Sequence, residues 1–213
     1  TDQPTRARPA RLWAAVIGGE VSVMEAAVAE NRSLIFTFQP ENTVQPGFAE
    51  RVRAVVEAHE GEVRFVRLLV SRSGASALET GPLPSPLGEP VKVAALPNPL
   101  DPSDWRLMHK TSDRGFYEDA LAAARGFGAQ EAVLVRADGF VTEGSFTCVF
   151  ADGPDGVLRT PPAHLGLLPG VLREQLIAEG RAREAELTLD DLAGGFFVGN
   201  ALRGLIPARL LGA

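Results

Sequence analysis

Three Asp-Gly pairs divide the segment from residue 131 to 159 into short apolar runs, and this spacing constrains the fold more than any other feature. The pairs stand at residues 138–139, 152–153 and 155–156. Asp-Gly favours tight turns between antiparallel strands, because glycine readily adopts the positive φ that these turns need. The spacing predicts a sheet of short strands, over residues 131–136, 140–142, 146–151 and 157–159.

Helical spacing predicts two helices in the same half of the chain, over residues 116–125 and 171–179, and a buried strand over 196–199. The first half looks different. A strand over 33–38, a helix over 46–60 and a strand over 62–71 suggest a β-α-β unit. Further expectations are a strand or helical turn followed by a helix within 12–29, a loop over 73–90, a strand over 91–96 and a Pro-broken linker over 97–104.

We place a domain boundary near Asp104, which gives a small N-terminal α/β domain over residues 1–104 and a C-terminal domain over 105–213. The expected fold class is α+β. With 213 residues, of which 45% are hydrophobic and 23% charged, the chain is long enough to bury a substantial core.

Charge and composition exclude several classes of protein. A net charge of −6 with scattered basic residues argues against a nucleic-acid partner. The apolar runs fall far short of the roughly 20 residues that a membrane span needs. One cysteine excludes an internal disulfide and a multi-thiolate metal site, and we predict no metal site. The polar, Arg-rich opening does not resemble a signal peptide, so we expect a cytoplasmic protein.

Lysine is rare in this chain. Lys92 and Lys110 are its only lysines, and every other basic residue is arginine. An amine can lose its proton at accessible pH, whereas a guanidinium in a protein does not, so a retained lysine indicates a possible need for a reactive amine. Lys110 lies between a linker and a predicted helix and is the best nucleophile candidate, able to form a Schiff base with a carbonyl group. A solvated lysine at a helix start is the alternative.

Glu143 is a second candidate, because it stands on a predicted strand and is followed by small hydroxyl residues. A buried glutamate needs a partner, and a pyridinium N–H would be one. The alternative is a glutamate at an exposed strand end, with Ser145 and Thr147 filling a β surface.

Two glycine-containing turns could bind anions. Pro169 and Gly170 precede a predicted helix, so the free N–H groups of Val171 and Leu172 would favour a phosphate. The segment 199–204 follows an apolar strand and could present backbone N–H groups and the Asn200 side chain. Both could equally be ordinary turns with no ligand, because glycine and proline are common between secondary-structure elements.

These segments, in this order, resemble the class IV aminotransferases. The resemblance extends from about Arg67 to Leu210, and its most specific elements are HKTSDRGFYEDAL, EAVLVRADGFVTEGSFTCVF, LRTPPAHLGLLPGVLRE, AELTLDD and FFVGNALRGLIPARL. The resemblance implies a two-domain fold-type-IV enzyme with pyridoxal 5′-phosphate (PLP) in the cleft between its domains. It also implies that the site is completed in a homodimer.

Transferred residue by residue, the resemblance implies that Lys110 is the catalytic Schiff-base lysine and that Glu143 is the partner of the pyridine nitrogen. Tyr117 would reach the phenolic oxygen of the cofactor. The remaining cofactor contacts that it implies are Ser145, Thr147, the N–H groups of Val171 and Leu172, and the turn of Asn200, Ala201 and Leu202.

The N-terminal third lacks the family's opening pattern, and residues 1–66 are atypical. Part of that stretch is vaguely similar to nucleotide kinases, but the chain has no P-loop. We expect a small-molecule amino substrate and favour 4-amino-4-deoxychorismate lyase, which forms 4-aminobenzoate and pyruvate in folate biosynthesis. A branched-chain or D-amino-acid aminotransferase is the alternative. A non-catalytic remnant of a PLP domain is a second alternative.

Overall fold

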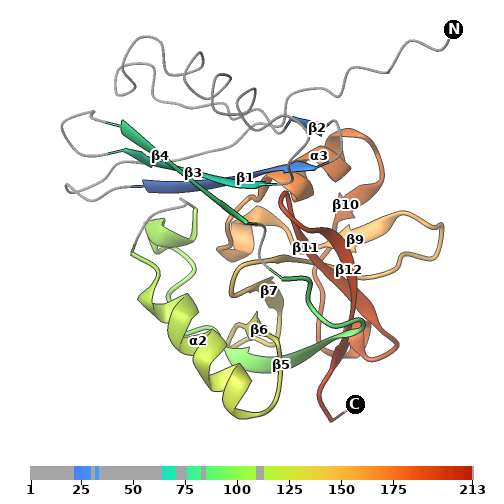
Figure 1. Cartoon of the computed structure of the whole chain (residues 1–213). Coiled ribbons are helices and arrows are strands. Elements are labelled where there is room, and N and C mark those ends of the chain that lie inside the picture. The colour runs from blue at the N-terminus through green and yellow to red at the C-terminus, as the bar shows by residue number, and fades with distance from the viewer. Residues whose placement is uncertain are drawn as a thin grey trace, which may run out of the picture. The chain divides into compact units, whose positions relative to one another are not determined.

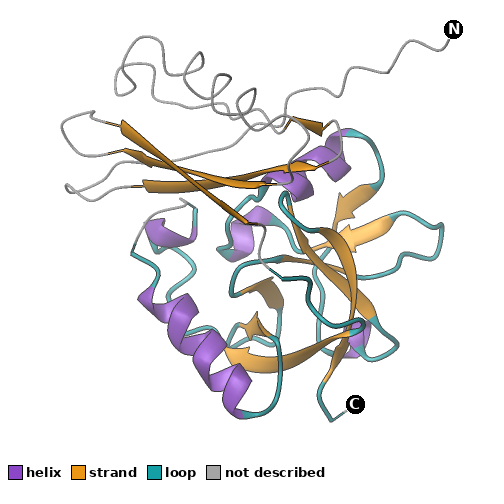
Figure 2. Cartoon of the chain, viewed as in Figure 1, coloured by secondary structure: helices purple, strands orange, loops and turns teal. Residues whose placement is uncertain are grey.

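The structure is a computed structural model that describes residues 22–29, 32–33, 64–70, 76–82, 85–108 and 113–212. The chain forms two compact units that divide between Pro84 and Ser85. Each unit has a sheet of its own (Figures 1 and 2).

The first unit contains a four-stranded antiparallel sheet in the order β2-β1-β3-β4. Two expectations were wrong here: the helix expected toward residue 29 is replaced by β1, and the loop expected over 73–90 contains β4. The helix expected over 46–60 and most of the strand expected over 33–38 lie outside the described residues. The strands are β1 (Ser22–Ala29), β2 (Arg32–Ser33), β3 (Arg64–Val70) and β4 (Ser76–Pro82).

The second unit is built on a mixed six-stranded sheet in the order β7-β6-β5-β12-β11-β8. β5 pairs in parallel with β6 and with β12, and the other pairs are antiparallel. This mixture of parallel and antiparallel strands, with few helices, confirms the expected α+β class. The strands are β5 (Val91–Pro97), β6 (Glu131–Val135), β7 (Val141–Gly144), β8 (Cys148–Phe150), β11 (Phe196–Asn200) and β12 (Gly204–Leu210).

The remaining elements of the second unit are short apart from one helix. A parallel pair, β9 (Leu158–Thr160) and β10 (Ala182–Glu184), lies beside the main sheet. The helices are α2 (Gly115–Gly126), α3 (Val171–Ala178) and the 3-10 turns η1 (Trp105–Leu107), η2 (Ala163–Leu165) and η3 (Asp190–Leu192).

The boundary between the units differs from the one expected near Asp104. β5 lies inside the six-stranded sheet, between β6 and β12, so residues 91–97 belong to the second unit. The expectation failed because a Pro-rich linker follows β5 in the sequence. In the structure that linker leads from one strand to the helices of the same unit.

Among the described residues of the second unit, apolar clusters hold α2 and α3 on the sheet and fill the space between its strands. Small side chains let α2 approach β5 and β6 closely, through Ala124 against Ala94 and Ala132. α3 packs through Leu176 on Phe150 of β8. The largest cluster is formed mainly by the sheet strands; its fully buried members include Val91, Val93, Val133, Val149 and Val198. This packing holds the C-terminal part of α2 against β5 and β6 and the C-terminal part of α3 against β8.

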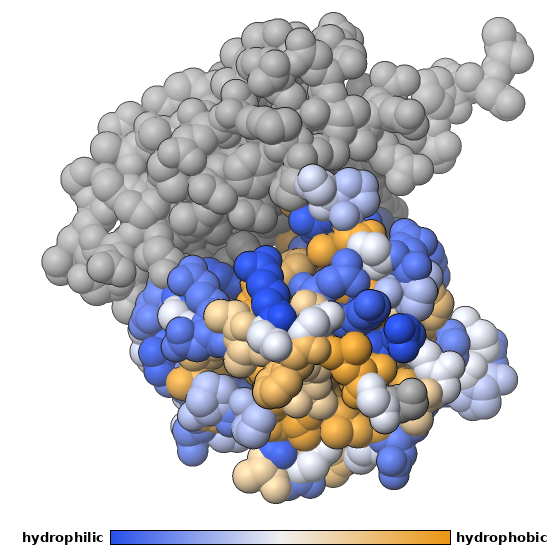
Figure 3. Space-filling view, turned by 60° about the horizontal axis from the view of Figure 1, so that its bottom comes forward, coloured by the Kyte–Doolittle hydropathy of each residue, from blue (hydrophilic) through white to orange (hydrophobic). Residues whose placement is uncertain are grey.

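No helix among the described residues is long and apolar enough to cross a membrane. The face of the second unit in Figure 3 carries hydrophilic residues around a more apolar area.

Candidate active site

Glu143 is held at the end of β7, where the strand carries a β-bulge. Val133 pairs with Gly144 and Val135 pairs with Val141, so a step of two residues on β6 matches a step of three on β7. Such a bulge re-aims side chains and is common beside active sites. The Glu143 side chain is buried, with the residue only 5% exposed.

The described partners of Glu143 come from elements distant in sequence. Its Oε1 accepts a hydrogen bond of 2.5 Å from the Tyr117 hydroxyl of α2 and one of 3.2 Å from the backbone N–H of Leu168. A buried carboxylate is tolerated only where donors surround it. Glu143 is therefore a buried hydrogen-bond acceptor at the point where α2 and the loop before α3 meet the sheet.

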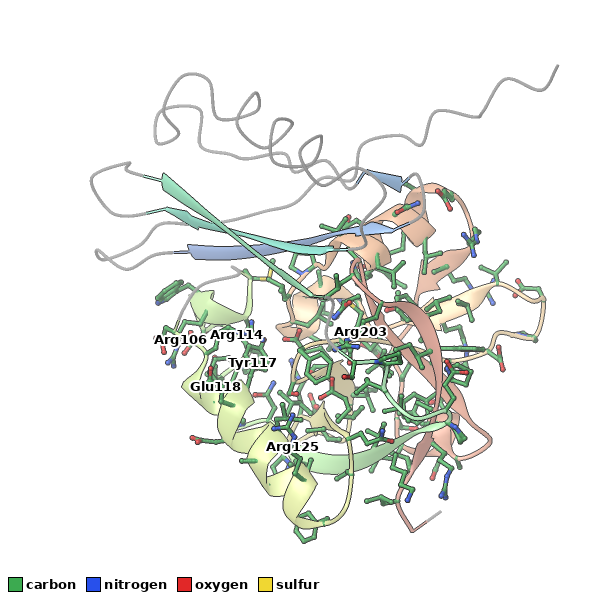
Figure 4. The ribbon with its side chains drawn as sticks, viewed as in Figure 1. Arg106, Arg114, Tyr117, Glu118, Arg125 and Arg203 are labelled. Atoms are coloured by element: carbon green, nitrogen blue, oxygen red, sulfur yellow. The ribbon has the colours of Figure 1, made fainter. Side chains whose placement is uncertain are left out.

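Tyr117 lies in the first turn of α2 and is buried (Figure 4). Burial, followed by the negative charge of Glu143 and the hydrogen bond to it, raises the pKa of the Tyr117 phenol above its usual value. The guanidinium carbon of Arg114 lies 4.6 Å from the centre of the Tyr117 ring. Tyr117 is thus a proton-bearing donor, and the structure brings it together with Glu143.

Glu131, the first residue of β6, is a fully buried carboxylate that the sequence reasoning missed. Four donors surround it. The N–H groups of Ala132 and Ser145 donate to Oε1 over 2.7 and 3.0 Å, as does the Ser145 hydroxyl, and the Thr147 hydroxyl donates to Oε2 over 2.9 Å. Burial raises the pKa of the Glu131 carboxyl, although these hydrogen bonds oppose the rise.

Ser145 and Thr147 therefore direct their hydroxyl groups at Glu131. Both residues are buried. They hold the turn after β7 around a carboxylate of the neighbouring strand, and their expected role beside a cofactor stays a prediction.

Gly144 is required by the same turn. A Cβ atom there would lie 2.3 Å from the Thr147 hydroxyl oxygen and 3.1 Å from Oε2 of Glu131. No side chain fits between these two atoms without displacing one of them. The sequence Glu-Gly-Ser-x-Thr is thus explained by packing around Glu131.

The two turns expected to bind anions lie side by side. A Cβ on Gly199 would lie 2.9 Å from Cδ2 of Leu172, so β11 closely approaches the first turn of α3. Gly170 precedes α3 and provides no side-chain cap. The N–H groups of Val171 and Leu172 have no partner within the helix, as at any helix start.

The start of α3 is anchored by Arg173, which is 2% exposed. Its guanidinium donates to the carbonyl of Pro161 over 3.0 Å and forms ion pairs with Glu174 and Glu184. A buried charge held on several sides fixes the direction in which the first N–H groups of the helix point.

The Asn200 side chain organises the second turn from within. Its amide donates to the carbonyl of Phe146 over 3.1 Å, and its Oδ1 accepts from the N–H groups of Leu202 and Arg203. Leu202 was expected to offer its N–H to an anion, but this N–H donates to Asn200 instead, as in an Asx-turn. Asn200 also ties the turn to the segment that follows Glu143.

The model for amino-transferase class IV matches residues 33–211 of this chain. The chain belongs to the class IV aminotransferases. The match begins well before Arg67, so residues 33–66, expected to be atypical, largely fall within the family. A search of curated proteins finds no match.

Solved structures agree with this assignment. A protein from Mesorhizobium loti, provisionally named an amino-acid aminotransferase, is 33% identical, with a TM-score of 0.74 over 90% of this chain and 99% of that one. An aminotransferase of Mycobacterium tuberculosis called hypothetical, solved with α-ketoglutarate and PMP, is 20% identical over 92% and 83% of the two chains, with a TM-score of 0.72. A Legionella pneumophila protein provisionally named 4-amino-4-deoxychorismate lyase is 17% identical, with a TM-score of 0.68 over 91% and 84%.

Membership of the class IV aminotransferases implies pyridoxal phosphate as cofactor, and the donor set fits it. Glu143 is a buried acceptor suited to a protonated ring nitrogen, Tyr117 is a buried hydroxyl beside it, and the start of α3 offers N–H groups to a phosphate. Lys110 and its neighbour His109 lie outside the described residues. Among the residues that are described, no group of His, Cys, Asp and Glu could hold a metal ion.

Proposed function

We propose that this class IV aminotransferase is a PLP-dependent enzyme that acts on the amino group of a small substrate. The observation that carries the proposal is Glu143. It is a buried carboxylate, re-aimed by a β-bulge, whose donor Tyr117 follows Lys110 by only seven positions (117 − 110).

Each residue has a distinct part in the proposed reaction. The cofactor, when bound, supplies an electron-withdrawing ring. Glu143 keeps a proton on the ring nitrogen, because a buried carboxylate favours a cationic partner. Lys110 would hold the cofactor through its amine and would move the proton at the substrate's α-carbon. Tyr117 donates its hydroxyl proton to Glu143, and would reach the phenolic oxygen only if this hydroxyl turned away from Glu143.

The phosphate is assigned to the start of α3. Val171 and Leu172 would hold it through their N–H groups, with the helix dipole favouring its charge. Asn200 and Ala201 would face it, or a substrate carboxylate, from the adjacent turn. Because Leu202 donates to Asn200, its contribution is to shape the turn.

Of the two candidate reactions, we favour that of 4-amino-4-deoxychorismate lyase over transamination. The motif NALRGLIPARL resembles lyase-type members more than branched-chain aminotransferases. The Legionella protein provisionally named as this lyase shares the fold of this chain, as do the aminotransferases. We further propose that the site is completed in a homodimer, as in relatives of this family.

An amino-acid aminotransferase is the second candidate. The Mesorhizobium loti protein that favours it is 33% identical over nearly its whole length. The two candidates share the removal of a proton from the substrate and differ in their products. The lyase would release pyruvate and 4-aminobenzoate, whereas a transaminase would release the keto acid of its amino-acid substrate.

The proposal is tested by adding PLP to the purified protein, recording its absorbance, and treating it with borohydride. We expect a violet-region band and a pyridoxyl group on Lys110 by peptide mass mapping. Lys92, an exposed residue of β5 and the only other lysine, is an internal control for nonspecific labelling. Lys110→Ala should lack the band and the label, whereas Lys92→Arg should keep both.

A colourless protein, or equal labelling of both lysines, would overturn the proposal and leave the non-catalytic remnant. For a protein that takes up PLP, pyruvate and 4-aminobenzoate from aminodeoxychorismate identify the lyase. Keto-acid formation from branched-chain or D-amino acids identifies the transaminase.

A further inference from the structure

The proposed mechanism leaves Glu131 without a part, yet Glu131 is a fully buried carboxylate that accepts four hydrogen bonds. Three of its four donors belong to Ser145 and Thr147, which follow Glu143 by two and four positions. Together with the close fit of Gly144, these bonds wrap the chain after Glu143 around one buried group.

Arg114 joins the same turn from the helix side. Its Nη2 donates to the carbonyl of Ser145 over 2.9 Å, while its guanidinium stacks on Tyr117. A planar guanidinium can donate from its edge and stack through its face at once, which a lysine cannot do. Arg114 therefore fixes Tyr117 relative to the turn that Glu131 holds.

The contacts form a closed circuit. Glu131 holds Ser145, Ser145 accepts from Arg114, Arg114 stacks on Tyr117, and Tyr117 donates to Glu143, two residues before Ser145. Both ends of the Tyr117–Glu143 hydrogen bond are thus held by groups outside it. Lys110 precedes Arg114 by four positions in the sequence.

We propose that Glu131 and Arg114 are positioning residues that together set the Tyr117–Glu143 pair for the cofactor. The inference rests on the proposed function for its purpose, but the coupling of Glu131 to Tyr117 is a property of the protein alone. Displacement of a reacting or holding group by about 1 Å can cost about 100-fold in rate, so such positioning has a functional consequence.

The coupling can be tested without cofactor because Tyr117 is the only tyrosine. Biosynthetic replacement by 3-fluorotyrosine gives a single fluorine resonance at this position. Glu131→Gln keeps the shape of the side chain but removes its negative charge and replaces one acceptor oxygen with a donor, so the Thr147 hydroxyl has to turn from donor to acceptor and the hydrogen bonds of the turn rearrange. We expect the Tyr117 resonance to move or broaden, although no bond joins these two residues.

The controls separate positioning from general destabilisation. Glu118→Gln changes an exposed glutamate in the first turn of the same helix and should leave the resonance in place (Figure 4). Thr147→Val removes one hydrogen bond to Glu131. If Glu131→Gln does not fold, this variant replaces it in the experiment and should also move or broaden the Tyr117 resonance. A resonance unchanged in a variant that has lost thermal stability would show a merely structural role and overturn the inference.

A second arm uses the protein loaded with PLP. If Glu143 is displaced, the ring nitrogen is less often protonated, and loss of this nearby positive charge would raise the pKa of the lysine's Schiff base. The violet band should therefore persist to a pH about 1 unit higher. Glu131→Gln and Arg114→Met should each produce this shift, and the double variant should shift by less than the sum. Arg125→Met, at the exposed far end of α2, is the matched control.

The outcomes distinguish the two proposals. If wild type binds no PLP but Glu131→Gln still moves the fluorine resonance, the function fails and the coupling stands. If PLP binds normally and neither variant moves the resonance or the pH midpoint, the positioning inference is wrong while the function stands.

Discussion

Two buried glutamates on neighbouring strands differ in where their hydrogen-bond donors come from. The donors to Glu131 at the start of β6 are local: its following N–H and the turn that leaves β7. The described donors to Glu143 at the end of β7 come from α2 and from the loop before α3. Glu131 thus holds its own sheet together, whereas Glu143 lies where separate elements converge.

This difference separates a carboxylate that maintains structure from one that is placed for chemistry. Local donors saturate a group and cannot be exchanged without breaking the strand pair. Donors that belong to elements outside the strand pair can be redirected to a ligand without breaking that pair. We therefore expect substitution of Glu143 to lower mainly the activity, and substitution of Glu131 to lower mainly the stability.

The largest effect is expected for Glu143→Gln on turnover. Loss of one preorganised electrostatic partner costs about 10²–10³-fold in kcat, and the neutral amide cannot keep the ring nitrogen protonated. The free energy of unfolding should stay within about 1 kcal/mol of wild type, because the amide oxygen still accepts from Tyr117. Steady-state kinetics and urea unfolding measure the two quantities.

A Glu143→Gln variant with lower stability but normal turnover would show that Glu143 maintains structure and has no part in the chemistry. Glu118→Gln, on the surface of α2, is the control and should change neither quantity.

Glu131→Ala should show the converse pattern, with stability as the main loss. Removal of the carboxylate leaves the buried donors of Ser145 and Thr147 without an acceptor, which costs about 1–3 kcal/mol for each unsatisfied group. We expect a decrease of at least about 3 kcal/mol in the free energy of unfolding. Urea titration followed by circular dichroism checks it, and a loss below about 1 kcal/mol would show that the turn does not depend on Glu131.

Gly144→Ala tests how closely the turn after Glu143 packs on Glu131, because the substituted residue ends β7 and faces the carboxylate of β6. The added methyl group conflicts with the Thr147 hydroxyl and with Oε2 of Glu131. Overpacking of this kind costs about 1–3 kcal/mol. Thermal unfolding should report the loss, and Gly126→Ala, where a Cβ meets nothing within 4 Å, should be free of it.

The smallest expected effect is a pH dependence from Glu131. Because burial raises the pKa of its carboxyl, the folded state holds the proton more tightly than the unfolded chain. Its contribution to the free energy of unfolding therefore falls as pH rises from about 4 through the folded-state pKa, by at most about 1.4 kcal/mol per pH unit. Glu131→Gln should lose this slope in urea titrations at several pH values; equal slopes in both proteins would contradict the assignment.

Patterns of local origin were predictable from the sequence. The Asp-Gly pair at 138–139 lies in the turn between β6 and β7, where Gly139 has a φ of +90°. Helical spacing located α2 and α3 to within a residue or so of their ends. The order of the motifs gave the family, which the match over residues 33–211 confirms.

Features that depend on distant pairing were not predictable. β12 contains Pro207 and begins at Gly204, so its residues do not favour a strand, yet it pairs with β5 and β11. Glu131 was overlooked because a charged residue at a strand start is usually exposed. The continuous apolar run after it, Ala132–Val135, was the available indication that the whole strand is buried.

The interior position of β12 has a consequence for biosynthesis. β5 leaves the ribosome long before β12, and until β12 is made both β5 and β11 present open edges to other chains. A nascent chain must therefore be kept from aggregating until β12 is translated. A product that stopped just before Gly204 would lack β12 and its sheet would be divided in two, so it should be cleared by proteolysis rather than persist as a shortened enzyme.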